Sequence, residues 1–244
     1  MTPKNTTPRK KTIFFAAILS PILIILVLFL ILLSYHLIVE RFGDPELQEE
    51  IAQKYGQKTE VQKVQRVSSI SEAVNALIHP HNPQLGPPDA PITLIMFIDF
   101  ECPFCSLSFP ILESVIETYG PALRVVFKHT PIESMHPLAK QASVAAQCAH
   151  EQNQFWAYYR LLFSTEQLDT DSLITHAKTL NLNLSTFSTC LTSEEIQKQI
   201  LTDLQDGLTL KLKGTPTYII NNQKVEGVVP KETWDTIILN ALQK

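Results

Sequence analysis

The hydrophobic pattern begins with one long apolar run close to the N-terminus. Residues 12–39 contain no charged side chain and are dominated by isoleucine and leucine. The run is longer than the roughly 20 residues with which an apolar helix spans a bilayer, and longer than the roughly 7–15 apolar residues of a secretory signal peptide. It therefore predicts an uncleaved transmembrane signal anchor, with a long cleaved signal peptide and a buried core helix as the alternatives.

The charges on either side of this run predict its orientation. Residues 1–11 carry lysine and arginine, whereas Glu40, Asp44 and Glu46 follow the run. The positive-inside rule makes 1–11 a cytoplasmic tail and places the rest of the chain outside the cytoplasm, as in a bacterial single-pass protein of the cell membrane. A cleaved signal peptide would export the same residues, so both interpretations expose them to conditions in which disulfides persist.

Residues 40–84 have the pattern of a stalk and linker. Short amphipathic stretches lead to a proline-rich segment at 80–91, and prolines there end any helix. An apolar stripe over 74–78 either docks on the domain that follows or drives self-association. We expect the domain boundary near Leu85 and one folded domain over 85–244.

Within this domain the period of the apolar positions changes twice. Two apolar, strand-like runs flank a helical one, and such a unit implies parallel strands joined by a right-handed crossover. A helical block follows, and a β-hairpin and a last helix end the domain. The predicted elements are strands at 92–98 and 122–128 around a helix at 106–119; helices at 139–149, 155–163, 173–180 and 193–204; and strands at 217–220 and 224–229 before a helix at 231–242.

Composition excludes some classes of function. The formal net charge is −4 and the positive charges form no stripe, which argues against a nucleic-acid partner. Four cysteines in 244 residues are too few for a disulfide-dense scaffold, so an apolar core must hold the domain. A zinc site on Cys102 and Cys105 would need two further ligands at matching spacing, and the sequence offers none.

The most informative short motif is a Cys-X-X-Cys at 102–105, where the first strand turns into a helix. Unpaired N–H groups and the helix dipole favour negative charge at Cys102, and the thiolate is the reactive form of cysteine. Pro103 suits the first helical position. The two-residue spacing lets Cys105 close a disulfide with Cys102 and reopen it. The motif predicts a thiol–disulfide exchange site.

From about Leu85 to its end, the chain resembles the DsbA-like thiol–disulfide oxidoreductases. In that family an α/β thioredoxin fold carries an inserted helical domain, which would lie at about 134–208 here. The resemblance is carried by several separated features. They are the strand end and motif at 97–105, Pro110 in the next helix, His136-Pro137 before an alanine-rich helix, the segments 148–152 and 155–156, and Gly214-Thr215-Pro216-Thr217 before a strand.

The resemblance implies a role for each residue of the site. Cys102 would attack and form mixed disulfides, and Cys105 would be the buried resolving cysteine. Pro216 would follow a cis peptide bond beside the cysteines, leaving the backbone of Thr215 to pair with an extended substrate chain. No cofactor and no metal is implied, because the redox-active disulfide itself carries the electrons.

The sequence departs from the family pattern at two places. DsbA has histidine where this motif has Phe104, which cannot donate a side-chain hydrogen bond, so we expect a less stabilised thiolate and a less oxidising disulfide. Most relatives also have a buried carboxylate six residues before the first cysteine, where this chain has Met96. Asp99, Glu101 or a water molecule would have to help deprotonate Cys105, although Asp99 suits a structural role at the strand end.

Cys148 and Cys190 lie where some relatives carry a second disulfide within the helical domain. The resemblance therefore implies a structural disulfide between them. The alternative is two buried free thiols, because cysteine packs well as a small hydrophobic residue.

These features together predict a membrane-anchored oxidoreductase that forms or exchanges disulfides in exported, cysteine-containing proteins. The membrane contact would be made by 12–39, and a redox partner in the membrane would reset the cysteine pair. An oxidase is favoured over an isomerase or reductase of the same fold. The alternative from another class is an extracytoplasmic, chaperone-like binding module.

Overall fold

A computed structural model describes Leu32, residues 76–221 and residues 223–243 of the protein. The chain divides into two compact units, Met1–Glu60 and Val61–Lys244, and the second contains everything that follows. The predicted tail, the predicted anchor apart from Leu32, and most of the predicted stalk lie outside the described residues. Among the residues that are described, no helix has both the length and the apolar character needed to cross a bilayer.

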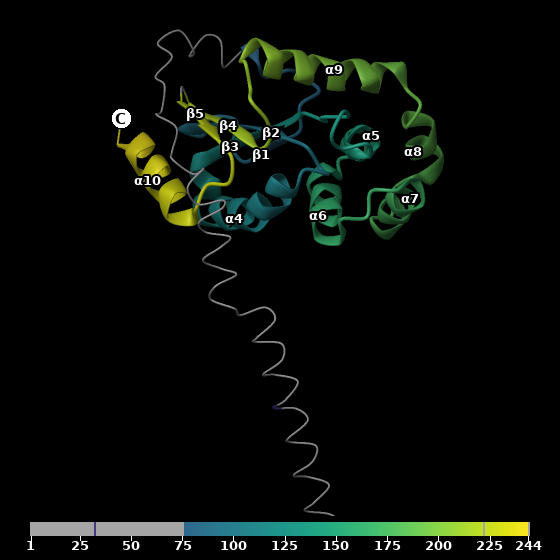
Figure 1. Ribbon diagram of the computed structural model, residues 1–244, viewed down its shortest axis with the longest axis horizontal. Helices are drawn as coiled ribbons and strands as arrows, with labels where there is room; N and C mark the ends of the chain where they lie inside the picture. The colour runs from purple at the N-terminus through teal and green to yellow at the C-terminus, as the bar shows by residue number, and fades with distance from the viewer. Residues whose placement is uncertain (1–31, 33–75, 222, 244) are drawn as a thin grey trace, which may run out of the picture. The chain divides into compact units, whose positions relative to one another are not determined.

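A five-stranded sheet with the order β1-β3-β2-β4-β5 lies at the centre of the described unit (Figure 1). The central strand β2 (Ile92–Ile98) runs parallel to β3 (Leu123–His129), as the strand–helix–strand pattern predicts. On its other side β2 pairs antiparallel with β4 (Thr217–Ile220), which forms a hairpin with β5 (Gln223–Glu226). The short strand β1 (Gln84–Leu85) pairs antiparallel with β3 and has too few residues to show an alternating pattern.

The helices follow the predicted order, with one addition. Helix α4 lies between β2 and β3, five helices lie between β3 and β4, and α10 ends the described chain. The unpredicted helix is α8, which is short and mostly exposed and so lacks a strong apolar period. The bounds are α4 Pro103–Tyr119, a 3-10 turn at Gly120–Ala122, α5 Ala139–His150, α6 Phe155–Thr165, α7 Thr170–Thr179, α8 Leu184–Cys190, α9 Glu194–Thr209 and α10 Lys231–Leu242.

Side chains alternate between the two faces of β2, and both faces are buried. Met96 and its neighbours two residues away lie in the larger core, which also contains residues of α4 and α10. Phe97 belongs to a second, smaller core that includes Leu77. Figure 1 shows α4 and α10 on one side of the sheet and α9 on the other. The sheet is therefore a middle layer, and the cysteine motif follows directly after its central strand, β2.

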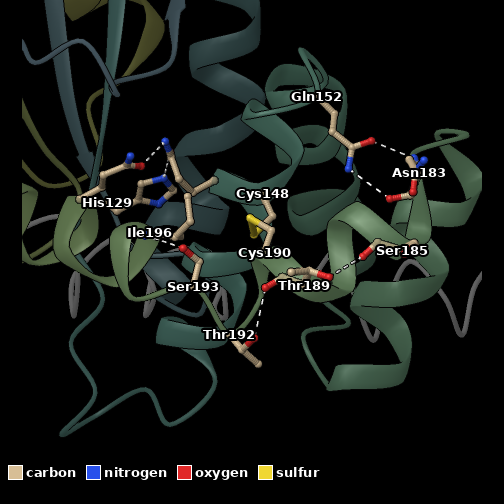
Figure 2. Close-up of a disulfide and its surroundings, with 12 residues drawn as sticks. His129, Cys148, Gln152, Asn183, Ser185, Thr189, Cys190, Thr192, Ser193 and Ile196 are labelled. Carbon is tan, nitrogen blue, oxygen red and sulfur yellow. Dashed lines mark hydrogen bonds between the residues drawn. A yellow bond between two sulfur atoms is a disulfide. The ribbon is translucent and has the colours of Figure 1, made fainter.

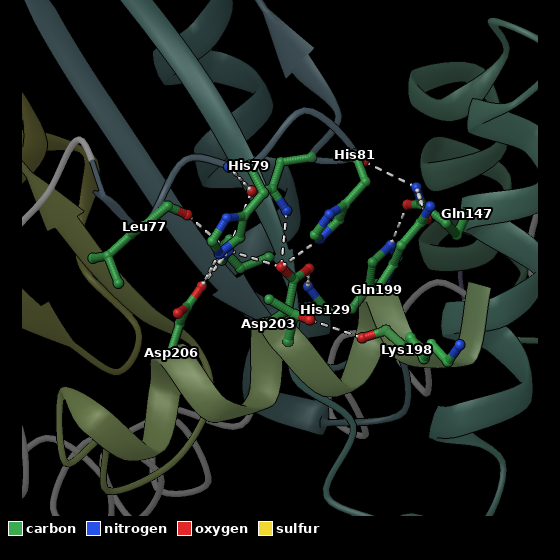
Figure 3. A network of polar contacts seen from close by, with 12 residues as sticks. Leu77, His79, His81, His129, Gln147, Lys198, Gln199, Asp203 and Asp206 are labelled. Atoms are coloured by element: carbon green, nitrogen blue, oxygen red, sulfur yellow. Dashed lines mark hydrogen bonds and ion pairs between the residues drawn. The ribbon is translucent and has the colours of Figure 1, made fainter. Parts of the chain in front are cut away.

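Residues before the expected boundary near Leu85 are already packed into this unit. The buried ammonium group of Lys128 donates to the carbonyl oxygen of Leu77 at 2.8 Å. The same nitrogen lies 2.7 Å from Asp203 Oδ1 and 2.6 Å from Asp206 Oδ2 on α9. Figure 3 shows these two aspartates among the labelled residues of the network. A buried charge is stable only when it is paired and hydrogen-bonded, so these contacts tie the chain at Leu77 to β3 and α9.

Two histidines extend the same network. His79 Nε2 lies 2.8 Å from Asp206 Oδ2, and His81 Nε2 lies 3.1 Å from Asp203 Oδ1. Their rings stack with centroids 5.3 Å apart. The segment 77–82 therefore belongs to the domain, which begins earlier than the proline pattern suggests.

A disulfide joins Cys148 on α5 to Cys190 on α8, as the family resemblance implies (Figure 2). The two Cα atoms are 5.7 Å apart and the cysteines are separated by 42 residues. Beside it, Gln152 Oε1 accepts a hydrogen bond of 2.8 Å from the backbone N–H of Asn183. The disulfide thus closes a loop that contains α6 and α7.

Replacing both cysteines, Cys148→Ala with Cys190→Ala, should lower the free energy of unfolding by roughly 2–4 kcal/mol, because the unfolded chain regains the entropy of this loop. Urea unfolding of the variant and of the wild type measures the loss. Redox reactivity at Cys102 should be retained, which separates this effect from the other cysteine pair. An unchanged free energy of unfolding would show that the two cysteines are not joined in solution.

Candidate active site

The cysteine motif lies where β2 ends and α4 begins. Cys102 is the N-cap residue of α4 and Pro103 occupies its first turn. The carbonyl oxygen of Cys102 accepts from the backbone N–H groups of Cys105 at 2.9 Å and Ser106 at 3.1 Å, which closes the first turn. Cys102 is 4% exposed and Cys105 is 1% exposed. Both cysteines are therefore buried, and Cys105 is the more deeply buried of the two.

The environment lowers the pKa of Cys102 to about 6. The largest cause is a hydrogen bond to its thiolate from the Cys105 side chain, and burial acts in the opposite direction. The Thr215 side chain and the backbone N–H groups of Cys105 and Phe104 also favour the thiolate. Phe104 thus contributes through its backbone, although its side chain cannot donate. Cys102 is mostly a thiolate at neutral pH, the form that attacks disulfides.

The pKa of Cys105 is shifted in the opposite direction. Burial raises it well above its ordinary value, and the neighbouring Cys102 raises it further. Cys105 is therefore protonated when Cys102 is ionised. The two cysteines differ in the way that an attacking and a resolving cysteine require.

Thr215 and Pro216 lie beside Cys102, although 113 residues separate Thr215 from Cys102 in the sequence. The Thr215–Pro216 peptide bond is cis. The thiol form of Cys102 donates to the carbonyl oxygen of Thr215 at 3.3 Å. The Thr215 hydroxyl has no other partner within the described part of the chain, which leaves it available to the Cys102 thiolate. The structure brings all four residues that the sequence assigns to the reaction into one place.

Asp99 is a structural residue at the end of β2. Its buried carboxylate accepts from the backbone N–H of Glu101 and from that of Ile132, each at 2.8 Å. Asp99 Oδ2 also lies 2.7 Å from His136 Nδ1. Burial lowers the pKa of His136, but the contact with Asp99 outweighs it and raises that pKa overall. Asp99 thereby fixes the loop that follows β3 against the start of the motif.

The surface around the motif has exposed apolar side chains. Phe104 and Leu107 project from the first turns of α4, and Met135 lies next to His136 in the loop after β3. Leu107 is four residues before Ile111, the spacing of an apolar helix face, but it is 60% exposed. Exposed large apolar groups beside a reactive sulfur suit contact with a polypeptide.

The described part of the chain contains no candidate metal centre. Within 76–221 and 223–243, no group of three or more histidine, cysteine or carboxylate side chains is placed to hold a metal ion. Thiol–disulfide exchange needs none, because electrons pass directly between sulfur atoms.

Comparison with solved structures shows the same fold in several proteins. The catalytic domain of Proteus mirabilis ScsC is 24% identical with a TM-score of 0.64, over 74% of this chain and 100% of that one. The thiol–disulfide exchange protein α-DsbA2 from Wolbachia pipientis is 16% identical with a TM-score of 0.65, over 71% and 94%. A thioredoxin-like oxidoreductase from Silicibacter pomeroyi is 21% identical with a TM-score of 0.63, over 69% and 96%.

Sequence comparison gives relatives of a different description. A protein named Na(+)/H(+) antiporter NhaA 3 from Salinispora tropica is 30% identical over 176 residues, which are 70% of this chain but 27% of that protein. The chain thus spans about a quarter of the length of these relatives. A thioredoxin family model matches residues 79–240. Since that match covers most of the chain and includes the helices between β3 and β4, the chain belongs to the thioredoxin family.

Proposed function

We propose that the protein is a thiol–disulfide oxidoreductase acting on cysteines of other proteins, and that it works as an oxidase. The observation that carries the proposal is the contrast within the motif. The pKa of Cys102 is lowered to about 6, whereas that of Cys105 is raised. The cis bond before Pro216 and the contact of Thr215 with Cys102 complete the site.

The reaction follows from this contrast. In the oxidising direction a substrate thiolate attacks Cys102 Sγ, the Cys102–Cys105 bond breaks, and Cys105 leaves with the electron pair. A second substrate thiolate then attacks the substrate sulfur of the mixed disulfide, and Cys102 leaves as a thiolate. Two electrons pass from the substrate to the cysteine pair. A thiol of low pKa leaves easily, so the second step favours oxidised substrate.

The lowered pKa of Cys102 also supports the direction of the reaction. A stabilised thiolate stabilises the reduced protein, which makes the disulfide more oxidising. The corresponding pKa values are about 7 in thioredoxin and about 3.5 in DsbA. A value of about 6 lies between them and agrees with the replacement of histidine by Phe104. We therefore expect an oxidant weaker than DsbA.

The proposed location is the outer side of the cell membrane, with residues 12–39 as the anchor and 1–11 in the cytoplasm. The disulfide between Cys148 and Cys190 supports an oxidising compartment. The proposed partners are exported proteins with cysteines and a membrane redox protein that reoxidises the pair. The exposed side chains of Phe104, Leu107 and Met135 support contact with such chains, and they equally favour a chaperone-like module as a second candidate.

Alkylation of the reduced protein by iodoacetamide should follow the ionisation of Cys102. The rate should rise as the pH passes through about 6 and level off above pH 7, where about nine-tenths of a group with this pKa is ionised. The reduced protein should correspondingly lose stability as the pH falls from about 9 to about 6, because the pKa of Cys102 is depressed in the folded state and the stabilisation is complete only above the ordinary thiol pKa. Stopped-flow alkylation at Cys102 measures the midpoint. The Cys105→Ala variant should have a higher midpoint, and a wild-type midpoint near 8.5 would contradict the assignment.

The reduction potential of the full chain in glutathione buffers should lie between about −200 mV and the value of DsbA, about −120 mV. It should thus be well above the value of thioredoxin, about −270 mV. A value near −270 mV would point to a reductase or isomerase instead.

The Cys105→Ala variant should trap mixed disulfides with reduced substrate proteins, and the Cys102→Ser variant should trap none. Suppression of aggregation that survives in Cys102→Ser without any exchange in the wild type would favour the chaperone-like module.

A further inference from the structure

The resolving cysteine must ionise to break a mixed disulfide, yet burial raises the pKa of Cys105 well above its ordinary value. Hydrogen bonds from the Asp99 backbone and the Thr215 side chain lower that pKa, but they do not offset burial. The residue at the position of the family's buried acid is Met96, which is fully buried and cannot accept a proton. Asp99 already accepts from two backbone N–H groups and contacts His136, so its carboxylate is directed at the loop after β3.

Two other polar groups lie in the layer beneath the cysteine pair. Ser108 is three residues after Cys105 on α4, so both side chains lie on the same face of that helix. Tyr218 is on β4, directly opposite Met96 on β2. Ser108 is 2% exposed and Tyr218 is 0% exposed. A helix and a strand thus each direct a hydroxyl group into the core on the side of the sheet that carries the motif.

Neither hydroxyl group forms a hydrogen bond of good geometry in the part of the chain that the structure describes, and the contact between Ser108 and Tyr218 is at most a weak one. A buried polar group without a partner lowers stability, so each such group in a folded protein calls for an explanation. The Tyr218 hydroxyl also interacts electrostatically with Ser108 and with both cysteines. Ser108 lowers the pKa of Tyr218, although burial raises it more strongly, and charge on Cys105 or Cys102 raises it as well. Tyr218 is therefore a neutral phenol within electrostatic reach of both sulfur atoms, able to donate but not to act as a base.

We propose that Ser108 and Tyr218 are positioning residues for Cys105, whose hydroxyl groups donate to its sulfur as it becomes a thiolate and so replace the buried acid that Met96 lacks. This inference rests on the proposed oxidoreductase function. In the resolving step Cys105 loses its proton and attacks Cys102 Sγ of the mixed disulfide. The Cys102–Cys105 bond forms, the bond to the substrate sulfur breaks, and that sulfur leaves with the electron pair and takes up a proton. The hydroxyl groups keep their own protons throughout, and they serve the reverse step equally.

The test separates attack by Cys102 from resolution by Cys105. Reduced full-length protein is mixed with glutathione disulfide, quenched with acid at set times, and analysed by mass spectrometry for the reduced, mixed-disulfide and oxidised forms. For the double variant Ser108→Ala with Tyr218→Phe, we expect attack within twofold of the wild type and resolution at least tenfold slower at pH 7. The pH profile of resolution should shift to higher pH, so that the two proteins converge in alkaline solution. Thermal stability should not fall, because the removed hydroxyls form no hydrogen bond of good geometry.

Matched controls make the same changes elsewhere in the domain. Tyr158→Phe removes a buried phenol that donates to Leu173 in the helical insertion, and Ser143→Ala removes a buried, unpartnered serine hydroxyl on α5. Both should resolve at the wild-type rate. Wild-type resolution by the double variant, or an equal slowing of attack and resolution, would overturn the proposal. If the wild type forms no mixed disulfide through Cys102, the proposed function fails instead, and the two failures are distinguishable.

Discussion

The antiparallel pairing of β2 with β4 is the constraint on which the redox site depends. Phe97 lies opposite Thr217 in that register, so the chain entering β4 passes the residues that leave β2. This places the carbonyl oxygen of Thr215 at 3.3 Å from Cys102 Sγ although 113 residues separate them. A slip of one residue would turn every side chain of β4 to the opposite face and move Thr215 away from the sulfur. The Cys-X-X-Cys motif alone is therefore only half of the site.

This register is stable because both faces of β2 are covered. The larger core fixes the face that carries Met96, and the smaller core with Leu77 fixes the face that carries Phe97. Segments far apart in sequence close the smaller side, since Lys128 on β3 joins the chain at Leu77 to Asp203 and Asp206 of α9. Removing Lys128 would leave Asp203 and Asp206 without their buried cation, which is strongly destabilising. The polar network thus connects the helical insertion to the sheet that carries the site.

Sequence patterns predict well what depends on local periodicity. The strands 92–98 and 217–220 appear as expected, as does the helix at 231–242, because buried runs and amphipathic faces leave a direct trace in the chain. The cysteine pair and Thr215-Pro216 were also identifiable, through the family resemblance. Sequence patterns do not predict contacts between residues that are far apart in the chain. Residues 79–82 looked like linker because their histidines and proline have no apolar period, and only the fold reveals the carboxylates they meet. Leu77 and Ile78, by contrast, pack against the domain, one of the two alternatives for the apolar stripe.

The same limit applies within the site. Leu107 belongs to the apolar face of α4 by spacing, yet it lies in the turn where that helix emerges beside the cysteines and is exposed. Asp99 and His136 are 37 residues apart, and nothing local indicates their contact. Ser108 and Tyr218 give no motif at all. Their relation to Cys105 follows only from a helical spacing combined with a strand register, which the sequence does not define.

Burial affects the two cysteines differently because they have different donors. Cys102 receives hydrogen bonds from Cys105, Thr215 and the first turn of α4, and these outweigh desolvation. The pKa of Cys105 is raised mainly by desolvation and further by the neighbouring Cys102. Once Cys102 is held in a mixed disulfide its charge is gone, so desolvation is the main cost that remains for Cys105.

An ionised acid at position 96 would address that cost in one way, by accepting the proton, but its negative charge would also raise the pKa of Cys102. Neutral hydroxyl groups on Ser108 and Tyr218 reduce the desolvation of Cys105 without adding charge. Met96 is then compatible with both requirements of the proposed oxidase, since Cys102 stays acidic and Cys105 still has donors when it must ionise. The absence of the buried carboxylate and the lowered pKa of Cys102 are in this sense one arrangement.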